Sequence, residues 1–203
     1  PVGFQNSALH SPHPYPSPEM DDSTFNFSTT LKHPVILQPG GTMSINEVVL
    51  VEPGSPGTVY GEQEFWDYVV VEGSSDCGKT WLPLEEGYDS RAYEIWEENY
   101  VSTADKQFSS AVGRAEWYVS REIQLTNNNF SAGDTILIRF RLFSDPYAYG
   151  WGWVIDDLRI QYPVSSPLTN LSPGNISVYP NPFNQHLNVR VIPETEITNM
   201  QLD

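Results

Sequence analysis

The stretch Thr135-Ile136-Leu137-Ile138-Arg139-Phe140-Arg141-Leu142-Phe143 decides the fold class of this chain. Apolar side chains recur at every second position from Ile136 to Leu142, and Arg139 and Arg141 stand between them. Because successive side chains of a β-strand point to opposite faces, this period of two predicts a strand with one buried face. Gly133-Asp134, directly before it, is typical of a turn.

Shorter stretches on the N-terminal side repeat this alternation. Trp66, Tyr68 and Val70 alternate with Asp67 in the same way, and residues 117–123 and 45–51 predict further strands. One short helix is expected at 92–100, within a long connection that spans residues 85–116. The chain is therefore expected to be all-β, and its long loops are where β scaffolds often carry function.

The segment Ser74-Ser75-Asp76-Cys77-Gly78-Lys79-Thr80-Trp81 fits the pattern S-x-D-x-G-x-T-W. Asp76 can accept hydrogen bonds from turn amides, and Gly78 permits a positive φ, so the segment predicts a tight hairpin turn. It resembles the Asp box of sialidases and related β proteins, in which the motif is structural. Sialidase propellers carry several copies, so the single copy here favours a turn in a sandwich.

The strand pattern ends with Gly150-Trp151-Gly152-Trp153-Val154-Ile155-Asp156-Asp157-Leu158-Arg159-Ile160. The alternation changes phase within it, because Trp151, Trp153 and Ile155 share one face whereas Leu158 and Ile160 lie on the other. A β-bulge near Asp156-Asp157 would produce this switch and would turn the two carboxylates in unusual directions.

Taken together, residues 31–162 resemble the MAM-like, or concanavalin-type, jelly-roll domains of secreted bacterial peptidases and adhesins of the Bacteroidetes type. The resemblance implies two packed antiparallel sheets forming a jelly-roll sandwich, and an ancillary role. The matching stretches are 65–71, the Asp-box turn, Gly133-Asp134, Arg139-Phe140-Arg141, Ser144-Asp145 and Trp153-Val154-Ile155-Asp156-Asp157.

The resemblance also implies a structural calcium ion, because several jelly-roll modules hold one with an acidic residue of the last strand. Asp156 or Asp157 would be that residue here, and Asp67, Glu64 or Asp145 would supply further oxygens. Calcium takes six to eight oxygen ligands. The alternative is that these acids cap turns and pair with Arg139, Arg141 or Arg159.

The chain divides into four predicted segments. Residues 1–22 are rich in Pro and Ser and predict a linker, residues 23–162 form the sandwich, and residues 163–175 form a second linker. Residues 176–203 begin with Ile176-Ser177-Val178-Tyr179-Pro180-Asn181-Pro182-Phe183-Asn184 and resemble the opening of the C-terminal sorting domain of type IX secretion. That resemblance implies an incomplete sorting domain, export by the type IX machinery, and a protein that is secreted or attached to the outer-membrane surface.

Composition excludes several function classes. Asp and Glu number 26 against 10 Lys and Arg, and a net charge of −16 disfavours nucleic acid and anionic membrane surfaces as partners. The charge is compatible with cation binding and equally with simple solubility. The single cysteine, Cys77, precludes an intrachain disulfide and cysteine-built metal sites, and no apolar stretch approaches the length of a membrane span.

These residues bear on three functions. Catalysis has little support, since neither G-x-S-x-G nor H-E-x-x-H occurs, so we expect a non-catalytic binding domain. Carbohydrate binding is favoured by the aromatic residues Tyr147, Tyr149 and Trp151 in one Gly-containing loop, with Trp96 as a second platform. The alternative is a protein-interaction or spacer module attached to a secreted peptidase or other hydrolase, and polysaccharide or a surface protein is the expected partner.

Overall fold

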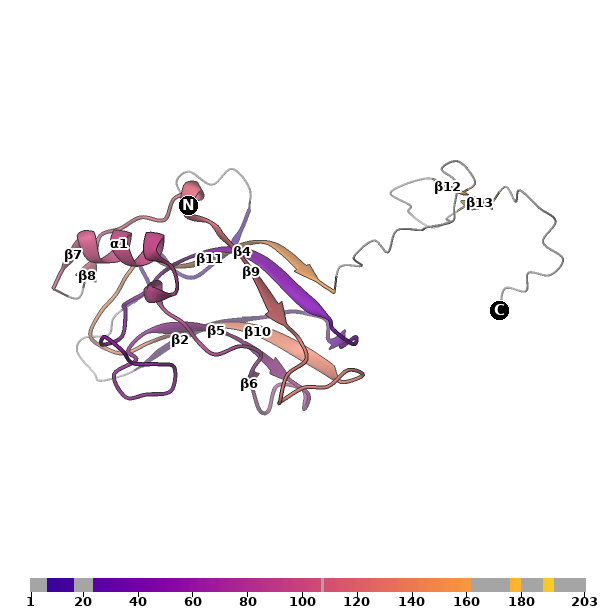
Figure 1. Ribbon diagram of the computed structural model, residues 1–203, viewed down its shortest axis with the longest axis horizontal. Helices are drawn as coiled ribbons and strands as arrows, with labels where there is room; N and C mark the ends of the chain where they lie inside the picture. Colours follow the sequence, from indigo (N-terminus) through magenta and orange to yellow (C-terminus); the bar gives the residue numbers. More distant parts are fainter. Residues whose placement is uncertain (1–6, 17–23, 107, 162–175, 180–187, 192–203) are drawn as a thin grey trace. The chain divides into compact units, whose positions relative to one another are not determined.

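The computed structural model describes residues 7–16, 24–106 and 108–161, and the backbone of 176–179 and 188–191. The chain divides into two compact units, Pro1–Tyr162 and Pro163–Asp203. In the first unit two antiparallel sheets lie one above the other (Figure 1). Their facing sides enclose one continuous apolar core, as predicted for an all-β sandwich.

The strand order confirms the jelly-roll arrangement, because the six long strands alternate between the two sheets along the chain. One sheet has the order β1 (Leu9–His10), β11 (Gly152–Ile160), β4 (Thr42–Leu50), β9 (Val119–Gln124). The other has the order β2 (Phe25–Thr30), β10 (Thr135–Ser144), β5 (Tyr68–Ser74), β6 (Leu82–Pro83), and β3 (Val35–Ile36) also pairs with β10.

Strand β10 lies at the centre of its sheet and has the predicted two faces. Its apolar positions, Ile136 to Leu142, are buried in the core. On the opposite face Arg139 and Arg141 both pair with Glu72 of β5, at N–O distances of 2.7 and 2.9 Å. The two arginines therefore neutralise a carboxylate that is itself buried.

The connection from 85 to 116 is the elaborated loop that its length predicts. It contains the 3-10 turns η1 (Ser90–Ala92) and η2 (Ala115–Trp117), the helix α1 (Glu94–Ser102) and a small hairpin of β7 (Ala104–Asp105) and β8 (Phe108–Ser109). Within the described part of the chain, no helix is long and apolar enough to cross a membrane.

Two local predictions are confirmed. In the Asp-box turn the Asp76 carboxylate accepts hydrogen bonds from the amide and hydroxyl of Thr80 and from the amide of Lys79, and these hold the pKa of Asp76 down to about 2. Gly78 has a φ of 85°. In β11 the register shifts between Asp156 and Arg159, and Asp157 has a φ of 51°, so the bulge lies where the phase of the pattern changes.

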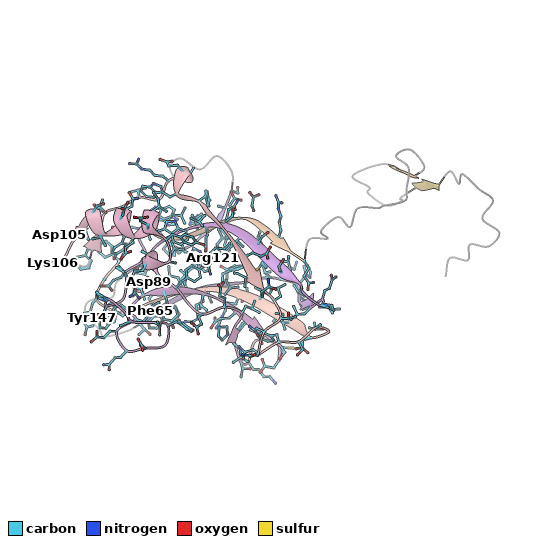
Figure 2. All side chains as sticks on the ribbon, in the orientation of Figure 1. Phe65, Asp89, Asp105, Lys106, Arg121 and Tyr147 are labelled. Atoms are coloured by element: carbon cyan, nitrogen blue, oxygen red, sulfur yellow. The ribbon has the colours of Figure 1, made fainter. Side chains whose placement is uncertain are left out.

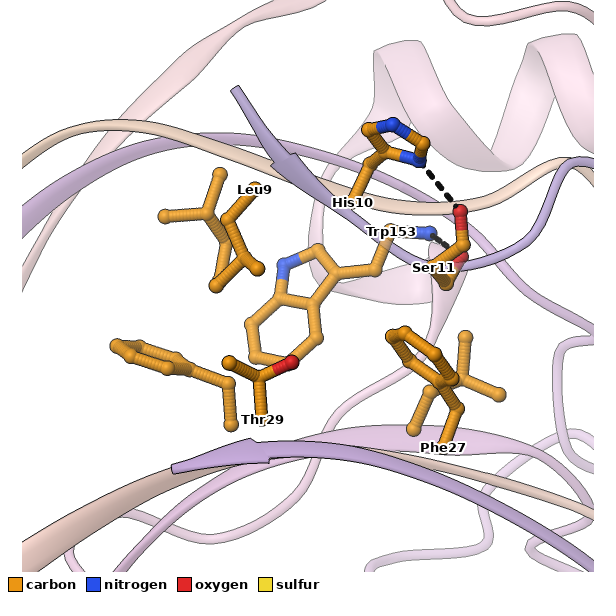
Figure 3. A pocket seen from close by; sticks show the side chains of 9 residues that line it. Leu9, His10, Ser11, Phe27, Thr29 and Trp153 are labelled. Atoms are coloured by element: carbon orange, nitrogen blue, oxygen red, sulfur yellow. Dashed lines mark hydrogen bonds between the residues drawn. The ribbon is translucent and has the colours of Figure 1, made fainter. Parts of the chain in front are cut away.

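The prediction that residues 1–22 form a linker outside the sandwich is wrong for residues 7–16. Strand β1 forms the edge of its sheet and pairs with β11, with Leu9 opposite Ile155, and Tyr15 is fully buried in the core. Figure 3 shows the ring of Trp153 between Leu9, from the N-terminal segment, and Phe27 and Thr29, from β2. Proline-rich chain suits this position because a sheet edge tolerates residues without an N–H.

The second unit contains one antiparallel pair, β12 (Ile176–Tyr179) with β13 (Asn188–Val191). This agrees with the prediction that a new strand pattern begins at Ile176. The Pro180-Asn181-Pro182 turn between the strands and the predicted linker 163–175 lie outside the described residues.

A substitution at Gly152 would test how closely the N-terminal segment packs against the sandwich. A Cβ on Gly152 would lie 2.1 Å from Ser11 Oγ, at a φ of 111°. We expect Gly152→Ala to lower the free energy of unfolding, measured by chemical denaturation, and to expose the N-terminal segment to limited proteolysis.

Gly133→Ala is the matched control, because Gly133 has a φ of 94° but nothing within 4 Å of its Cβ position. Both variants carry backbone strain of about 1–3 kcal/mol, and Gly152→Ala adds the clash. Equal losses in the two variants, with an unchanged cleavage pattern, would contradict the close packing of residues 7–16.

Candidate functional site

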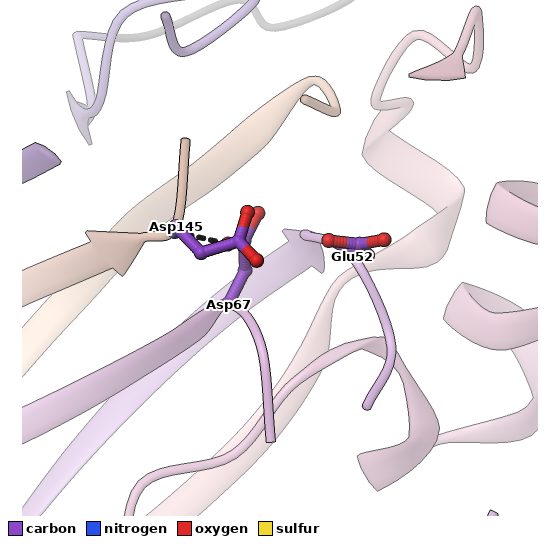
Figure 4. A group of neighbouring side chains, drawn as sticks. All are labelled: Glu52, Asp67 and Asp145. Atoms are coloured by element: carbon purple, nitrogen blue, oxygen red, sulfur yellow. Dashed lines mark hydrogen bonds between the residues drawn. The ribbon is translucent and has the colours of Figure 1, made fainter. Parts of the chain in front are cut away.

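Three carboxylates, which we call the acidic trio, meet at one end of the sandwich. Glu52, Asp67 and Asp145 each offer an oxygen, and these oxygens all lie within 4.8 Å of one another. Figure 4 shows the three side chains directed toward one another from three different segments. A group of carboxylate oxygens at this spacing could hold a metal ion, and hard cations such as Ca²⁺ or Mg²⁺ prefer such ligands.

Strand register brings the trio together. Asp67 directly precedes β5 and Asp145 directly follows β10, and the two strands pair with Tyr68 opposite Phe143. The Asp145 amide donates to Asp67 Oδ1 at 2.8 Å. Glu52 comes from the other sheet, two residues beyond the end of β4. The trio therefore links the ends of both sheets.

The N-terminal segment supplies the fourth contact. The Tyr15 hydroxyl donates to Asp67 Oδ2 at 2.5 Å and accepts from the Glu52 backbone amide at 3.0 Å. Both oxygens of the fully buried Asp67 carboxyl thus accept a hydrogen bond. By contrast, Glu52 Oε2 is buried and has no hydrogen-bond partner among the described residues.

Because the trio is largely buried, the ionised form of its carboxyl groups is disfavoured unless a positive charge lies nearby. Desolvation raises the pKa of Asp67 well above its usual range, and it raises the pKa of Glu52 to about 8, with the charge of Asp145 adding to the effect. At neutral pH these groups need either a proton or a cation to compensate their charge. The same desolvation, together with Asp67, raises the pKa of the Tyr15 hydroxyl.

The structure gathers two of the five predicted calcium ligands, Asp67 and Asp145. Asp156 and Asp157 lie instead at the bulge of β11, where Asp157 Oδ2 accepts from Asn46 at 2.9 Å, and the exposed Glu64 is not part of the trio. The expectation that Asp156 or Asp157 of the last strand joins these oxygens is thus corrected, because the third member of the trio is Glu52. The alternative, in which these acids pair with Arg139, Arg141 or Arg159, is wrong for the first two arginines, because both bind Glu72.

The predicted sugar-stacking residues do not form a single platform, although Tyr149 and Trp151 line one open pocket of about 390 Å³. Trp96 is fully buried and donates its indole N–H to the Trp117 carbonyl at 2.9 Å. Trp151 is only 6% exposed and is stacked on His13 at 3.9 Å, and Tyr149 is stacked on Phe108 at 4.7 Å. Tyr147 is 54% exposed and lies at the same end of the sandwich as Phe65 (Figure 2).

A different group of aromatic residues surrounds an open pocket of about 560 Å³ beside the trio, which we call the aromatic cleft. Its volume lies within the range of small-ligand sites. Asp145 belongs to both the cleft and the trio. The lining includes Tyr60, Gln63, Trp66, Tyr68, Phe143 and Asp145.

The cleft forms because the stretch 66–71 departs from the usual arrangement of a surface strand, in which polar side chains face solvent and apolar side chains face the core. Asp67, Val69 and Val71 are buried, whereas Trp66 and Tyr68 are half-buried on the other side. Burial therefore alternates only from Trp66 to Val69, since Val70 is fully buried as well, and there the carboxylate points inward and the rings outward. The partners that allow this, Tyr15 and the Asp145 amide, are far away in sequence.

No protein-family model matches this chain, and a search of curated proteins likewise finds no significant match.

The Tyr15 hydroxyl provides a direct test of the site. We expect Tyr15→Phe to lower the free energy of unfolding by about 1–3 kcal/mol, because a buried carboxyl oxygen loses its donor. Chemical denaturation at neutral pH measures the loss.

Tyr93→Phe is the control, since Tyr93 is half-buried but its hydroxyl has no hydrogen-bond partner within the described ranges. If removing the Tyr15 hydroxyl costs no more than removing that of Tyr93, then Tyr15 does not tie the N-terminal segment to Asp67.

Proposed function

We propose that this chain is a non-catalytic ancillary binding module of a secreted or cell-surface bacterial protein, with carbohydrate as its ligand and a structural calcium ion at the acidic trio. The observation that carries the proposal is the juxtaposition of an open, aromatic-lined cleft with a buried carboxylate cluster, joined through Asp145. Ligand sites of this kind combine apolar surface with a few placed polar groups.

Calcium is the cation that the trio fits best. The three side chains offer carboxylate oxygens only, which suits a hard cation, and calcium accepts irregular geometry and bidentate carboxylates where magnesium requires a near-ideal octahedron. The buried Glu52 Oε2, which lacks a partner among the described residues, supports a positive charge at this position. A bound ion would hold the ends of β4, β5 and β10 together and so fix one wall of the cleft.

The position of Glu47, one of the acids whose pKa burial raises strongly, is consistent with a non-catalytic role. Burial raises the pKa of Glu47 to about 7, a value that suits proton transfer. However, Glu47 is fully buried, and its Oε2 accepts hydrogen bonds from Tyr88 and Trp153, each at 2.7 Å. Its other oxygen forms an ion pair with Arg121 at 3.0 Å. These contacts assign Glu47 to the core, away from any substrate.

Secretion is proposed from the C-terminal segment. Residues 176–203 resemble the opening of a type IX sorting domain, and the antiparallel pairing of β12 with β13 is compatible with that resemblance. The type IX secretion machinery is accordingly proposed as a partner, with a final location in the medium or on the outer-membrane surface.

Thermal unfolding across pH, with calcium and with chelator, tests the proposed ion. The pKa of Glu52 is raised from 4.5 to about 8 on folding, so the folded state holds the proton more tightly. Without calcium, stability from this group is complete below pH 4.5 and is lost as pH rises through about 8. We therefore expect the melting temperature in chelator to fall between pH 5 and pH 8.

Calcium should reverse this fall at pH 8, since it replaces the proton. At 100 times its dissociation constant it would add about 2.7 kcal/mol, or about 5–10 °C in melting temperature. Glu52→Gln should abolish the calcium effect, whereas Glu64→Gln should retain it. An equal effect of calcium on wild type and Glu52→Gln, or its loss in Asp157→Asn alone, would contradict an ion at the trio.

A further inference from the structure

The aromatic cleft contains groups that the fold itself leaves unused. Trp66 lies two residues before β5 and is half-buried, and Gln63 is exposed and lines the cleft. Neither the Trp66 indole N–H nor the Gln63 side-chain amide has a hydrogen-bond partner within the described part of the chain. A tryptophan face, a free indole donor and a free amide around one pocket are groups that bind a molecule carrying both C–H faces and hydroxyls.

We propose that the aromatic cleft binds a neutral glycan, with one pyranose ring on the face of Trp66 and its hydroxyls hydrogen-bonded by Gln63 and Asp145. This inference rests on the proposed binding function and moves its site from the Tyr147–Trp151 loop to the cleft beside the trio. It also commits the ligand to uncharged polysaccharide.

The floor of the cleft is preorganised, which lowers the cost of binding. Tyr68 and Phe143 lie opposite each other on β5 and β10 and are stacked with ring centroids 4.8 Å apart. Tyr60 meets the Tyr68 ring edge-on at 5.0 Å. Because these rings already pack against one another, binding immobilises few additional side chains.

The charges around the cleft select against acidic polysaccharide. The carboxyl groups of Glu62 and Asp145 line it, and the whole chain carries a net charge of −16. Arg141 lies 5.4 Å from the centre of the Tyr68 ring but is paired with Glu72 at 2.9 Å. With that arginine engaged, uronic-acid or sulfated chains would meet uncompensated negative charge.

Affinity electrophoresis of the 203-residue chain in native gels tests the proposal. The gels contain a soluble neutral polysaccharide (mixed-linkage β-glucan, xyloglucan, galactomannan or arabinoxylan) or, for comparison, alginate. We expect retardation by at least one neutral polysaccharide and none by alginate. Trp66→Ala should weaken binding about tenfold or more, because truncating a central aromatic contact typically has an effect of this size.

The control variant is Tyr147→Ala, which removes an exposed ring outside the cleft and should bind as wild type does. Trp66→Phe keeps a stacking face and should retain part of the affinity. Melting temperatures of all variants establish that each is folded. Should Trp66→Ala itself fail to fold, Gln63→Ala at the exposed rim must still weaken retardation.

Each contrary result overturns a distinct claim. Retardation that survives Trp66→Ala, or is lost in Tyr147→Ala instead, excludes the cleft as the site and leaves a binding module. Retardation by alginate would contradict the proposed selection against acidic polysaccharide by the negative charges around the cleft. If no neutral polysaccharide retards the protein while calcium still raises its melting temperature, the proposed glycan site in the cleft is refuted. The proposed calcium ion at the trio would then still stand.

Discussion

The buried carboxyl of Asp67 is the constraint on which this end of the molecule depends. A carboxyl taken out of water is costly unless its oxygens are hydrogen-bonded. The partners that satisfy it are Tyr15, from the N-terminal segment, and the Asp145 amide, at the end of β10. One polar group thereby connects three segments that lie far apart in sequence. Residues 7–16 are part of the sandwich for this reason, in addition to the pairing of β1 with β11.

Buried acids recur in both sheets, and each is compensated locally. Glu47 of β4 is held by Arg121, Tyr88 and Trp153, and Glu72 of β5 by Arg139 and Arg141. Three of the few basic residues are therefore engaged by these two acids. The trio differs, because no Lys or Arg forms an ion pair with its three carboxylates among the described residues. That difference is why a cation is proposed there and not at Glu47 or Glu72.

Much of the fold follows from the sequence, because period two is a property of the strand itself. The buried face of residues 135–143, the turn at Asp76 and the bulge at Asp157 are all set by neighbours within a few residues. The inward direction of the Asp67 side chain is not set by near neighbours in the sequence, because it depends on a hydrogen bond from Tyr15. Of the trio, Asp67 and Asp145 carry signals in the sequence, whereas Glu52 follows an apolar strand without any motif. That Trp66 lines the cleft could be inferred only once the inward direction of the Asp67 side chain was known.

Terbium luminescence tests whether the acidic trio holds a cation beside Tyr15 of the N-terminal segment. Terbium replaces calcium at oxygen sites, and it emits when a nearby aromatic ring is excited. Tyr15 contacts Asp67 directly, so excitation of the protein should give terbium emission that calcium quenches by displacement. We expect this emission to be lost in Glu52→Gln. Emission of equal strength in that variant, or no emission from the wild type, would contradict it.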